Sequence, residues 1–141
     1  FDQLIWTDGI EHKYIEESGT MNIMFVIDGK LITPSESSDT ILRGITKRSV
    51  IEIVKKWDIE VVERHISVDS LVSALKQGRV SEAFGVGTAA TVASINEIGF
   101  RNQIFRLPTM TNENISTRVS EYLIDLKLGR IEDTMNWSVI V

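Results

Sequence analysis

Apolar runs bounded by turn residues divide the first part of the chain into short strands. Residues 23–27 (IMFVI) carry no polar side chain, which is typical of a buried strand and is too short for a helix. Asp28-Gly29 follows this run and predicts a two-residue hairpin turn, after which residues 31–33 return as the partner strand. A shorter apolar stretch at residues 3–6 ends at another Asp-Gly turn signal.

Helical spacing of apolar residues marks three later segments. Between residues 46 and 57, apolar side chains recur at the spacing of an amphipathic helix, and Thr46 is the expected N-cap. Residues 67–78 predict a second amphipathic helix, with a serine or aspartate cap at its start and a glycine at its end. A third helix is expected over residues 116–128.

The remaining segments predict further strands. Ile59 and Val61 alternate with charged residues, as in a half-buried strand. Residues 81–98 ("SEAFGVGTAATVASINEI") predict a strand, a tight turn and a second strand, and residues 104–107 predict one more. This order of strands and helices favours a single α+β domain with a mixed sheet.

Composition and charge narrow the function classes. The 141 residues suit one domain, and a hydrophobic fraction of 43% with a charged fraction of 25% is ordinary for a globular protein. The net charge is −5 without a basic cluster, so we expect no nucleic-acid partner. The absence of cysteine excludes disulfides, thiolate metal sites and cysteine nucleophiles, and we expect no metal. No apolar run approaches the ~20 residues that span a bilayer, so we expect no membrane partner.

The stretch "RGIT" at residues 43–46 is the first candidate for chemistry. Gly44, Ile45 and Thr46 lie at the predicted start of a helix, where free N–H groups and the positive end of the helix dipole favour an anion. A simpler interpretation is that Gly44 makes a turn and Thr46 caps the helix. The spacing alone favours that simpler interpretation.

The stretch "GVGTAA" at residues 85–90 is the second candidate. Small residues in a turn between strands bring backbone N–H groups close to whatever lies above them, and Thr88 adds a hydroxyl. A glycine-rich hairpin turn without a ligand explains the same pattern. The motif alone therefore does not establish a site.

The stretch "EESGT" at residues 16–20 places two carboxylates just ahead of the buried strand. Glu16 and Glu17 point to opposite faces if the segment is extended. A carboxylate next to a buried strand is costly unless it meets a cation or a hydrogen-bond donor. Adjacent glutamates more often lie in a solvent-facing loop, and without further information that interpretation is favoured.

Four motifs, read together, are similar to those of one enzyme family. "YIEESGTMN", "LRGITKRSVIEI", "ERHISVDSL" and "EAFGVGTAATVASINEI" occur in the order and spacing found in branched-chain amino acid aminotransferases. These are class IV, fold-type IV enzymes that use pyridoxal 5'-phosphate, and the resemblance covers nearly the whole chain. It implies the large C-terminal domain of that fold, a mixed sheet or pseudo-barrel with flanking helices.

The resemblance also implies how the cofactor is held. In such enzymes a strand-borne glutamate pairs with the protonated ring nitrogen of the cofactor, and the motif places that glutamate at Glu17. The cofactor phosphate meets the backbone of Gly44, Ile45 and Thr46, and the hydroxyl of Thr88 completes the phosphate site. The carboxylate of Glu17 is thus expected to face the site, and its neighbour is not.

Substrate contacts follow from the same resemblance. Thr20 and the backbone N–H of Ala89 match positions that receive the substrate α-carboxylate, and Met21 lines the neighbouring pocket. The intact enzyme is expected to move an amino group between leucine, isoleucine or valine and 2-oxoglutarate. The family also implies a homodimer, and we expect a cytoplasmic location.

Two departures from the family pattern concern Arg43 and the catalytic lysine. Arg43 stands where the family usually has proline, so the turn is less constrained. In the family, the lysine that binds the cofactor as a Schiff base lies upstream of the segment that resembles "FDQLIWTDG", so the resemblance implies that this chain holds no catalytic residue. We therefore expect residues 1–141 to be a single C-terminal cofactor-binding domain, a fragment that lacks the N-terminal domain and is inactive alone.

Two alternative functions remain open from the sequence. The first is another class IV enzyme, a D-amino acid aminotransferase or an aminodeoxychorismate lyase, although "GTMN" after the glutamates favours the branched-chain group. The second is a lysine-less domain that binds a phosphorylated ligand or a protein and catalyses no reaction.

Overall fold

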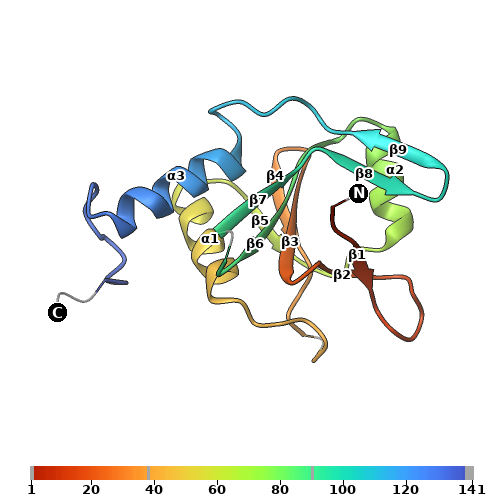
Figure 1. Ribbon diagram of the computed structural model, residues 1–141, viewed down its shortest axis with the longest axis horizontal. Coiled ribbons are helices and arrows are strands. Elements are labelled where there is room, and N and C mark those ends of the chain that lie inside the picture. The colour runs from red at the N-terminus through yellow and green to blue at the C-terminus, as the bar shows by residue number, and fades with distance from the viewer. Residues whose placement is uncertain (1, 38, 90, 139–141) are drawn as a thin grey trace.

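The computed structural model describes residues 2–37, 39–89 and 91–138, and it shows a curled sheet with helices on both faces (Figure 1). The strands are β1 (Ile5–Thr7), β2 (Ile15–Ser18), β3 (Met21–Ile27), β4 (Lys30–Thr33), β5 (Val61–Glu63), β6 (Val80–Gly87), β7 (Thr91–Ile95), β8 (Glu97–Phe100) and β9 (Gln103–Arg106). The helices are α1 (Ile45–Lys56), α2 (Val68–Lys76) and α3 (Ile115–Lys127).

The sheet is mixed, as the order of elements predicts. In the described residues, β1 to β7 form one seven-stranded sheet, and β8 and β9 form a separate hairpin. Strands β4 and β5 run parallel, whereas every other pair in these sheets is antiparallel. The second strand predicted within residues 81–98 is β7, and it ends at Ile95. The next strand, β8, begins at Glu97 and belongs to the separate hairpin. The chain changes sheet at Asn96, whose carbonyl accepts a hydrogen bond from the N–H of Leu107 at 2.9 Å.

Two strands, β2 and β4, pair in turn with the same edge of β3. Strand β2 pairs with the first two residues of β3, and β4 pairs with it from Phe25 onward. Strand β6 occupies the other edge from Asn22 to Ile27. We call the interval between β2 and β4 the seam. The hydroxyl of Thr33 donates to the carbonyl of Ile23 there at 2.8 Å, which satisfies a backbone group that strand pairing leaves open.

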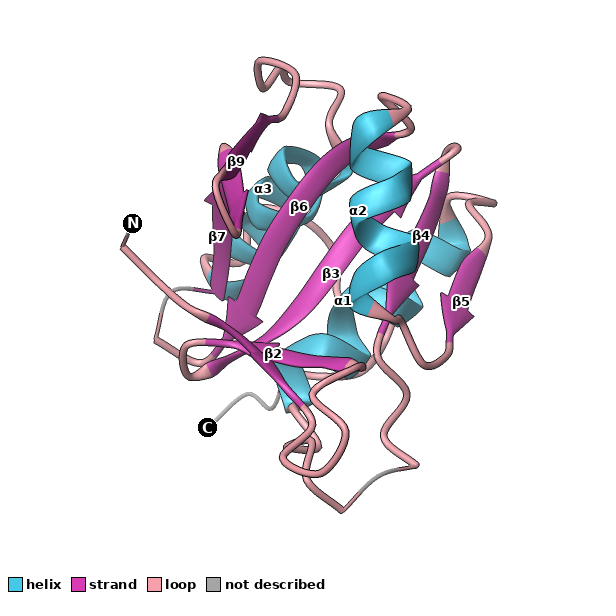
Figure 2. Ribbon diagram, turned by 90° about the vertical axis from the view of Figure 1, so that its right-hand side faces the viewer, coloured by secondary structure: helices cyan, strands magenta, loops and turns pink. Residues whose placement is uncertain are grey.

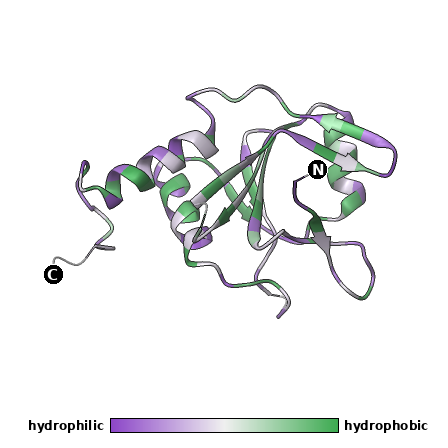
Figure 3. Ribbon diagram, viewed as in Figure 1, coloured by the Kyte–Doolittle hydropathy of each residue, from purple (hydrophilic) through white to green (hydrophobic). Residues whose placement is uncertain are grey.

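Each face of the sheet carries its own core. Helices α1 and α3 cover one face, and α2 lies on the other (Figures 1 and 2). Alternation along β3 sends Met24 and Val26 into the α1–α3 core, and Ile23, Phe25 and Ile27 into the α2 core. Because β3 is covered on both faces, its residues 23–27 form a continuous apolar run, and Figure 3 shows apolar residues along the central strands.

The first turn of α3 is capped from the sheet. The N-cap residue Asn114 makes no side-chain hydrogen bond to this helix. The buried carboxylate of Glu82 on β6 instead accepts hydrogen bonds from the N–H groups of Ile115 and Ser116, at 2.8 and 3.0 Å. It also accepts one from the Ser116 hydroxyl at 2.7 Å. This contact fixes α3 to β6 across the core.

The turn between β1 and β2 is organised by one carboxylate. Asp8 accepts hydrogen bonds from the N–H groups of Tyr14 at 2.7 Å, Glu11 at 2.6 Å and Lys13 at 2.8 Å. The N–H of Tyr14 has the largest effect, and together these donors lower the pKa of Asp8 from its usual 3.8 to about 2.

This low pKa predicts how the turn responds to acid. A depressed folded pKa means that the stabilisation is complete above about pH 3.8 and is lost as the pH falls toward about 2. We expect the NMR signals of the Lys13 and Tyr14 amides to titrate with a midpoint of about 2, and to stop titrating in the Asp8→Asn protein. A midpoint near the ordinary aspartate value would contradict this account of the turn.

Candidate functional site

The carboxylate of Glu17 lies beside the chain that leads into α1. Its Oε1 atom accepts a hydrogen bond from the N–H of Leu42 at 3.0 Å and a longer one from the side-chain amide of Asn22 at 3.4 Å. Leu42 precedes Gly44, the N-cap of α1. Both hydrogen bonds end on Oε1, and in the described part of the chain no cationic side chain pairs with Glu17. The half-buried carboxylate therefore keeps Oε2 for another donor.

The start of α1 is open to an anion. No side chain caps this helix, and its first turn contains no acidic residue. The N–H groups of the first turn have no partner within the helix, and the helix dipole makes this end positive. Ile45 is 83% exposed, so solvent and ligands reach this end of the helix.

The predicted N-cap is wrong by two residues. The helix begins at Ile45 with Gly44 as its N-cap, which places Thr46 in the first turn. Gly44 has the extended conformation of an N-cap (φ −73°, ψ 126°). Thr46 is therefore available as a hydroxyl donor near the helix start rather than as the cap.

The turn after β6 lies at the same end of the sheet. Val86 of β6 pairs with Asn22 of β3, so the end of β6 at Gly87 is next to the start of β3. Thr88 and Ala89 follow directly and are exposed. The structure thus brings the second and third sequence motifs to the end of the sheet where Asn22 lies.

Met21 is the first residue of β3, and Thr20 directly precedes it. Alternation points Met21 to the opposite face from Asn22, where it covers two glycines of β6. A β-carbon on Gly85 would come within 2.8 Å of the Met21 methyl carbon, and one on Gly87 within 3.2 Å of its Cγ. Thr20 is exposed in the turn between β2 and β3. Met21 is therefore grouped with the end of β6, and not with Glu17.

The neighbouring glutamates both contact the loop between β4 and α1. The carboxylate of Glu16 accepts a hydrogen bond from the hydroxyl of Thr40, whereas that of Glu17 accepts from Leu42. The two carboxylates reach this loop at positions two residues apart, and the expected orientation of Glu17 alone toward the site stays a prediction.

Asn22 is the residue of this region that the motif analysis did not single out. Its amide nitrogen donates to the carbonyl of Leu42 at 2.9 Å as well as to Glu17, and its side chain is buried. A signal was present in the sequence, because Asn22 is the one polar residue in the stretch "MNIMFVI". A polar residue in a buried strand requires hydrogen-bond partners.

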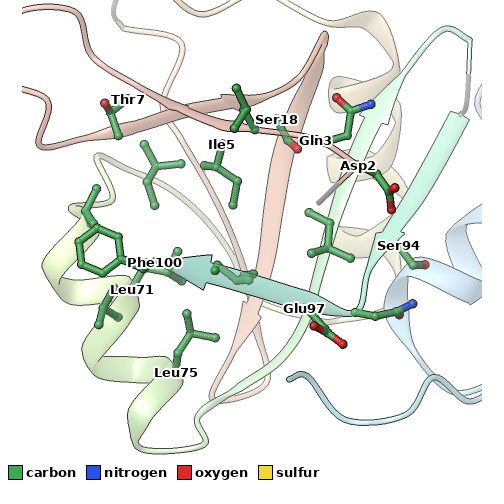
Figure 4. Close-up of a pocket in the computed structure, with 18 residues that line it drawn as sticks. Asp2, Gln3, Ile5, Thr7, Ser18, Leu71, Leu75, Ser94, Glu97 and Phe100 are labelled. Atoms are coloured by element: carbon green, nitrogen blue, oxygen red, sulfur yellow. The ribbon is translucent and has the colours of Figure 1, made fainter. Parts of the chain in front are cut away.

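A separate cavity lies on the other face of the sheet. It has a volume of about 760 Å³ and lies between β1, α2 and β8, with Ile5, Leu71, Leu75 and Phe100 among its lining residues (Figure 4). None of the predicted cofactor-binding or substrate-binding residues contributes to its lining. In the described residues there is also no cluster of acidic and histidine side chains that would hold a metal ion, and no helix suited to crossing a membrane.

Comparison with known proteins decides the family. Residues 1–98 match the model of the family described as amino-transferase class IV. The chain belongs to this family. Among curated class IV relatives, branched-chain-amino-acid transaminase 1 of Bacillus subtilis is 39% identical over 141 residues, which is 100% of this chain and 39% of that protein. The chain thus spans about two fifths of the length of the curated relatives it matches.

Solved class IV structures confirm the α+β fold. A branched-chain aminotransferase from Thermoproteus uzoniensis, solved with norvaline, matches with a TM-score of 0.76 at 30% identity, over 96% of this chain and 40% of that one. A branched-chain amino acid aminotransferase from Escherichia coli matches with a TM-score of 0.77 at 28% identity, over 96% of this chain and 41% of that one.

Proposed function

We propose that this chain is the C-terminal cofactor-binding domain of a branched-chain amino acid aminotransferase that uses pyridoxal 5'-phosphate. The observation that carries the proposal is the position of the Glu17 carboxylate, hydrogen-bonded to the segment that enters the uncapped α1. The names of the matched relatives support the branched-chain group over D-amino acid aminotransferase and aminodeoxychorismate lyase.

The residues present fit this cofactor. Among the described residues no hydrogen-bond donor contacts Oε2 of Glu17, so this oxygen can accept from a protonated ring nitrogen, and the negative charge of Glu17 keeps that proton in place. The backbone of Gly44, Ile45 and Thr46 and the hydroxyls of Thr46 and Thr88 would hold the phosphate, because uncapped N–H groups and hydroxyls are the donors that a dianion requires. When bound, the cofactor supplies a protonated ring that withdraws electrons from the substrate α-carbon as it loses its proton.

Substrates would bind beside the end of β6. We assign the α-carboxylate of the amino acid to Thr20 and the backbone N–H of Ala89, both of which are exposed and available to a ligand. The family resemblance alone assigns Met21 to the substrate pocket, because its side chain lies against the glycines of β6, on the opposite face of β3 from Asn22. The substrates are then leucine, isoleucine or valine and 2-oxoglutarate.

The lysine of the reaction is assigned to polypeptide outside these 141 residues. Lys47 is the lysine closest in sequence to the helix start, but its ammonium is buried and donates to the carbonyl of Pro34 at 2.7 Å. Lys13 lies over the ring of Tyr14, with its ammonium 5.2 Å from the ring centroid. We therefore expect the 141-residue chain alone to have no transaminase activity.

The intact enzyme would have further partners. Leu42 and Ile45 are 69% and 83% exposed beside the helix start, and a neighbouring domain or a second copy would cover this apolar surface. We propose an N-terminal domain and a homodimer. A cytoplasmic location is consistent with a chain that contains no cysteine.

The adjacent glutamates provide a matched test of this function. We expect the full-length protein to transfer the amino group of leucine to 2-oxoglutarate after addition of pyridoxal phosphate, and the 141-residue chain to catalyse no turnover. We expect Glu17→Gln to weaken cofactor binding by about tenfold, the effect of one charge-assisted contact, in a titration followed by visible absorbance. Glu16→Gln should leave that affinity unchanged. Turnover by the chain alone, or equal losses in the two variants, would refute the proposal.

A further inference from the structure

The two N–H groups of the Asn22 amide are both used inside the protein. They donate to the carbonyl of Leu42 at 2.9 Å and to Oε1 of Glu17 at 3.4 Å. Oε1 also accepts the N–H of Leu42 at 3.0 Å. The backbone of Leu42 is therefore held through both of its polar groups, one by Glu17 and the other by Asn22.

The carbonyl end of the same side chain packs against Gly44. A β-carbon on Gly44 would lie 2.1 Å from Oδ1 of Asn22, a distance at which atoms overlap. The backbone of Gly44 has a conformation that any residue can adopt. Glycine is thus required here by the neighbouring amide and not by the turn itself.

We infer that Asn22 is a positioning residue that sets the distance between the Glu17 carboxylate and the start of α1. It joins three segments, since it lies on β3, contacts Glu17 on β2 and binds the backbone that enters α1. This inference rests on the proposed function, because the distance matters only if one ligand contacts both places. Small displacements of binding groups are costly when a single rigid ligand must reach them all.

Asn22 acts through its neighbours and does not touch the ligand. Its side chain is 5% exposed, and its donors are already engaged by Leu42 and Glu17. Its effect on cofactor binding must therefore depend on the presence of the Glu17 carboxylate. That dependence separates a positioning role from a purely structural one.

The first test measures cofactor binding by the full-length protein. Asn22→Leu keeps approximately the volume of the side chain but removes the amide, and we expect it to weaken pyridoxal phosphate binding by about tenfold. In the Glu17→Gln background the same change should weaken binding by less than about threefold, because the contact it supports is already lost. Asn102→Ala, in the exposed turn between β8 and β9, is the control and should leave binding unchanged.

The second test needs no cofactor. Gly44→Ala should lower the folding equilibrium constant by roughly tenfold or more through overlap with Asn22, and by much less in the Asn22→Ala background, where the overlap is removed. Additive effects of the two changes would show that the amide does not occupy this space.

The outcomes distinguish the inference from the function on which it rests. If the unmodified full-length protein binds the cofactor and Asn22→Leu binds it equally well, the positioning role is refuted and the proposed function stands. If Asn22→Leu weakens binding equally with and without the Glu17 carboxylate, Asn22 is structural and the inference also fails. If the unmodified protein does not bind pyridoxal phosphate, the proposed function fails and the positioning role fails with it.

Discussion

We expect Lys47→Met to lower the free energy of unfolding by about 4 kcal/mol, the range found when one partner of a buried charged pair is removed. The ammonium of Lys47 is inaccessible to solvent and donates to the Pro34 carbonyl at 2.7 Å. It also lies 3.5 Å from Oε1 of Glu36 and 3.7 Å from Oε1 of Glu63. Oε1 of Glu36 is buried without a hydrogen bond in the described residues, so loss of the ammonium removes the cation nearest this oxygen and leaves the carboxylate with Arg48 alone, 3.6 Å from Oε2.

Urea denaturation of matched variants tests this expectation. Lys55→Ala removes an exposed lysine from the same helix and should change the free energy of unfolding by less than about 0.5 kcal/mol. Adding Glu36→Gln to Lys47→Met should recover part of the loss, because the carboxylate that has lost its nearest cation is then absent. A Lys47→Met protein as stable as the Lys55→Ala protein would show that the buried ammonium is not required.

We expect the second large effect on stability at Glu82, the residue of β6 whose carboxylate caps the start of α3. Glu82→Ala removes three hydrogen bonds to a carboxylate and leaves the N–H groups of Ile115 and Ser116 buried without an acceptor. We expect the free energy of unfolding to fall by about 3 kcal/mol. Glu82→Gln keeps one acceptor but loses the charge that favours a helix start, and should cost about half as much.

Hydrogen exchange and denaturation check the cap together. In Glu82→Ala the amides of Ile115 and Ser116 should exchange faster, while those in the middle of α3 change less. Glu121→Ala is the control, because Glu121 is exposed on the same helix. Equal stability of the Glu82→Ala and Glu121→Ala proteins would mean that the first turn of α3 has another acceptor.

The sequence predicted those elements whose pattern is local. The apolar run 23–27 and the Asp28-Gly29 turn indicated the β3–β4 hairpin, and both turn residues have the positive φ that such a turn requires. The three helices were found because their apolar spacing matches one buried face. The grouping of Glu17 with the start of α1 was expected only through the family resemblance.

The remaining features depend on contacts between distant segments. Lys47 resembles any helix-surface lysine, and its burial results from segments around Pro34 and Glu63. Glu82 interacts with a helix start more than thirty residues away, so no local pattern reveals it. Thr46 was a reasonable N-cap by residue type, but Gly44 takes that position. Local propensity does not identify which residue meets a neighbouring segment.

The seam in the sheet affects how β2 is connected to the rest of the protein. Two residue pairs join β2 to β3, and β2 pairs with neither β4 nor β6. The chain around β2 is also bound to the segment ahead of α2, through Ile15 N–H to the Ile66 carbonyl and Val68 N–H to the Lys13 carbonyl, each at 2.8 Å. Backbone hydrogen bonds therefore connect β2 directly to the start of α2, on the far face of the sheet, whereas β2 and β4 form no strand pair. The segment that enters α1 is joined to β2 and β3 by the side-chain hydrogen bonds of Glu17 and Asn22 to Leu42, so these two side chains connect the start of α1 to the strands that α2 supports.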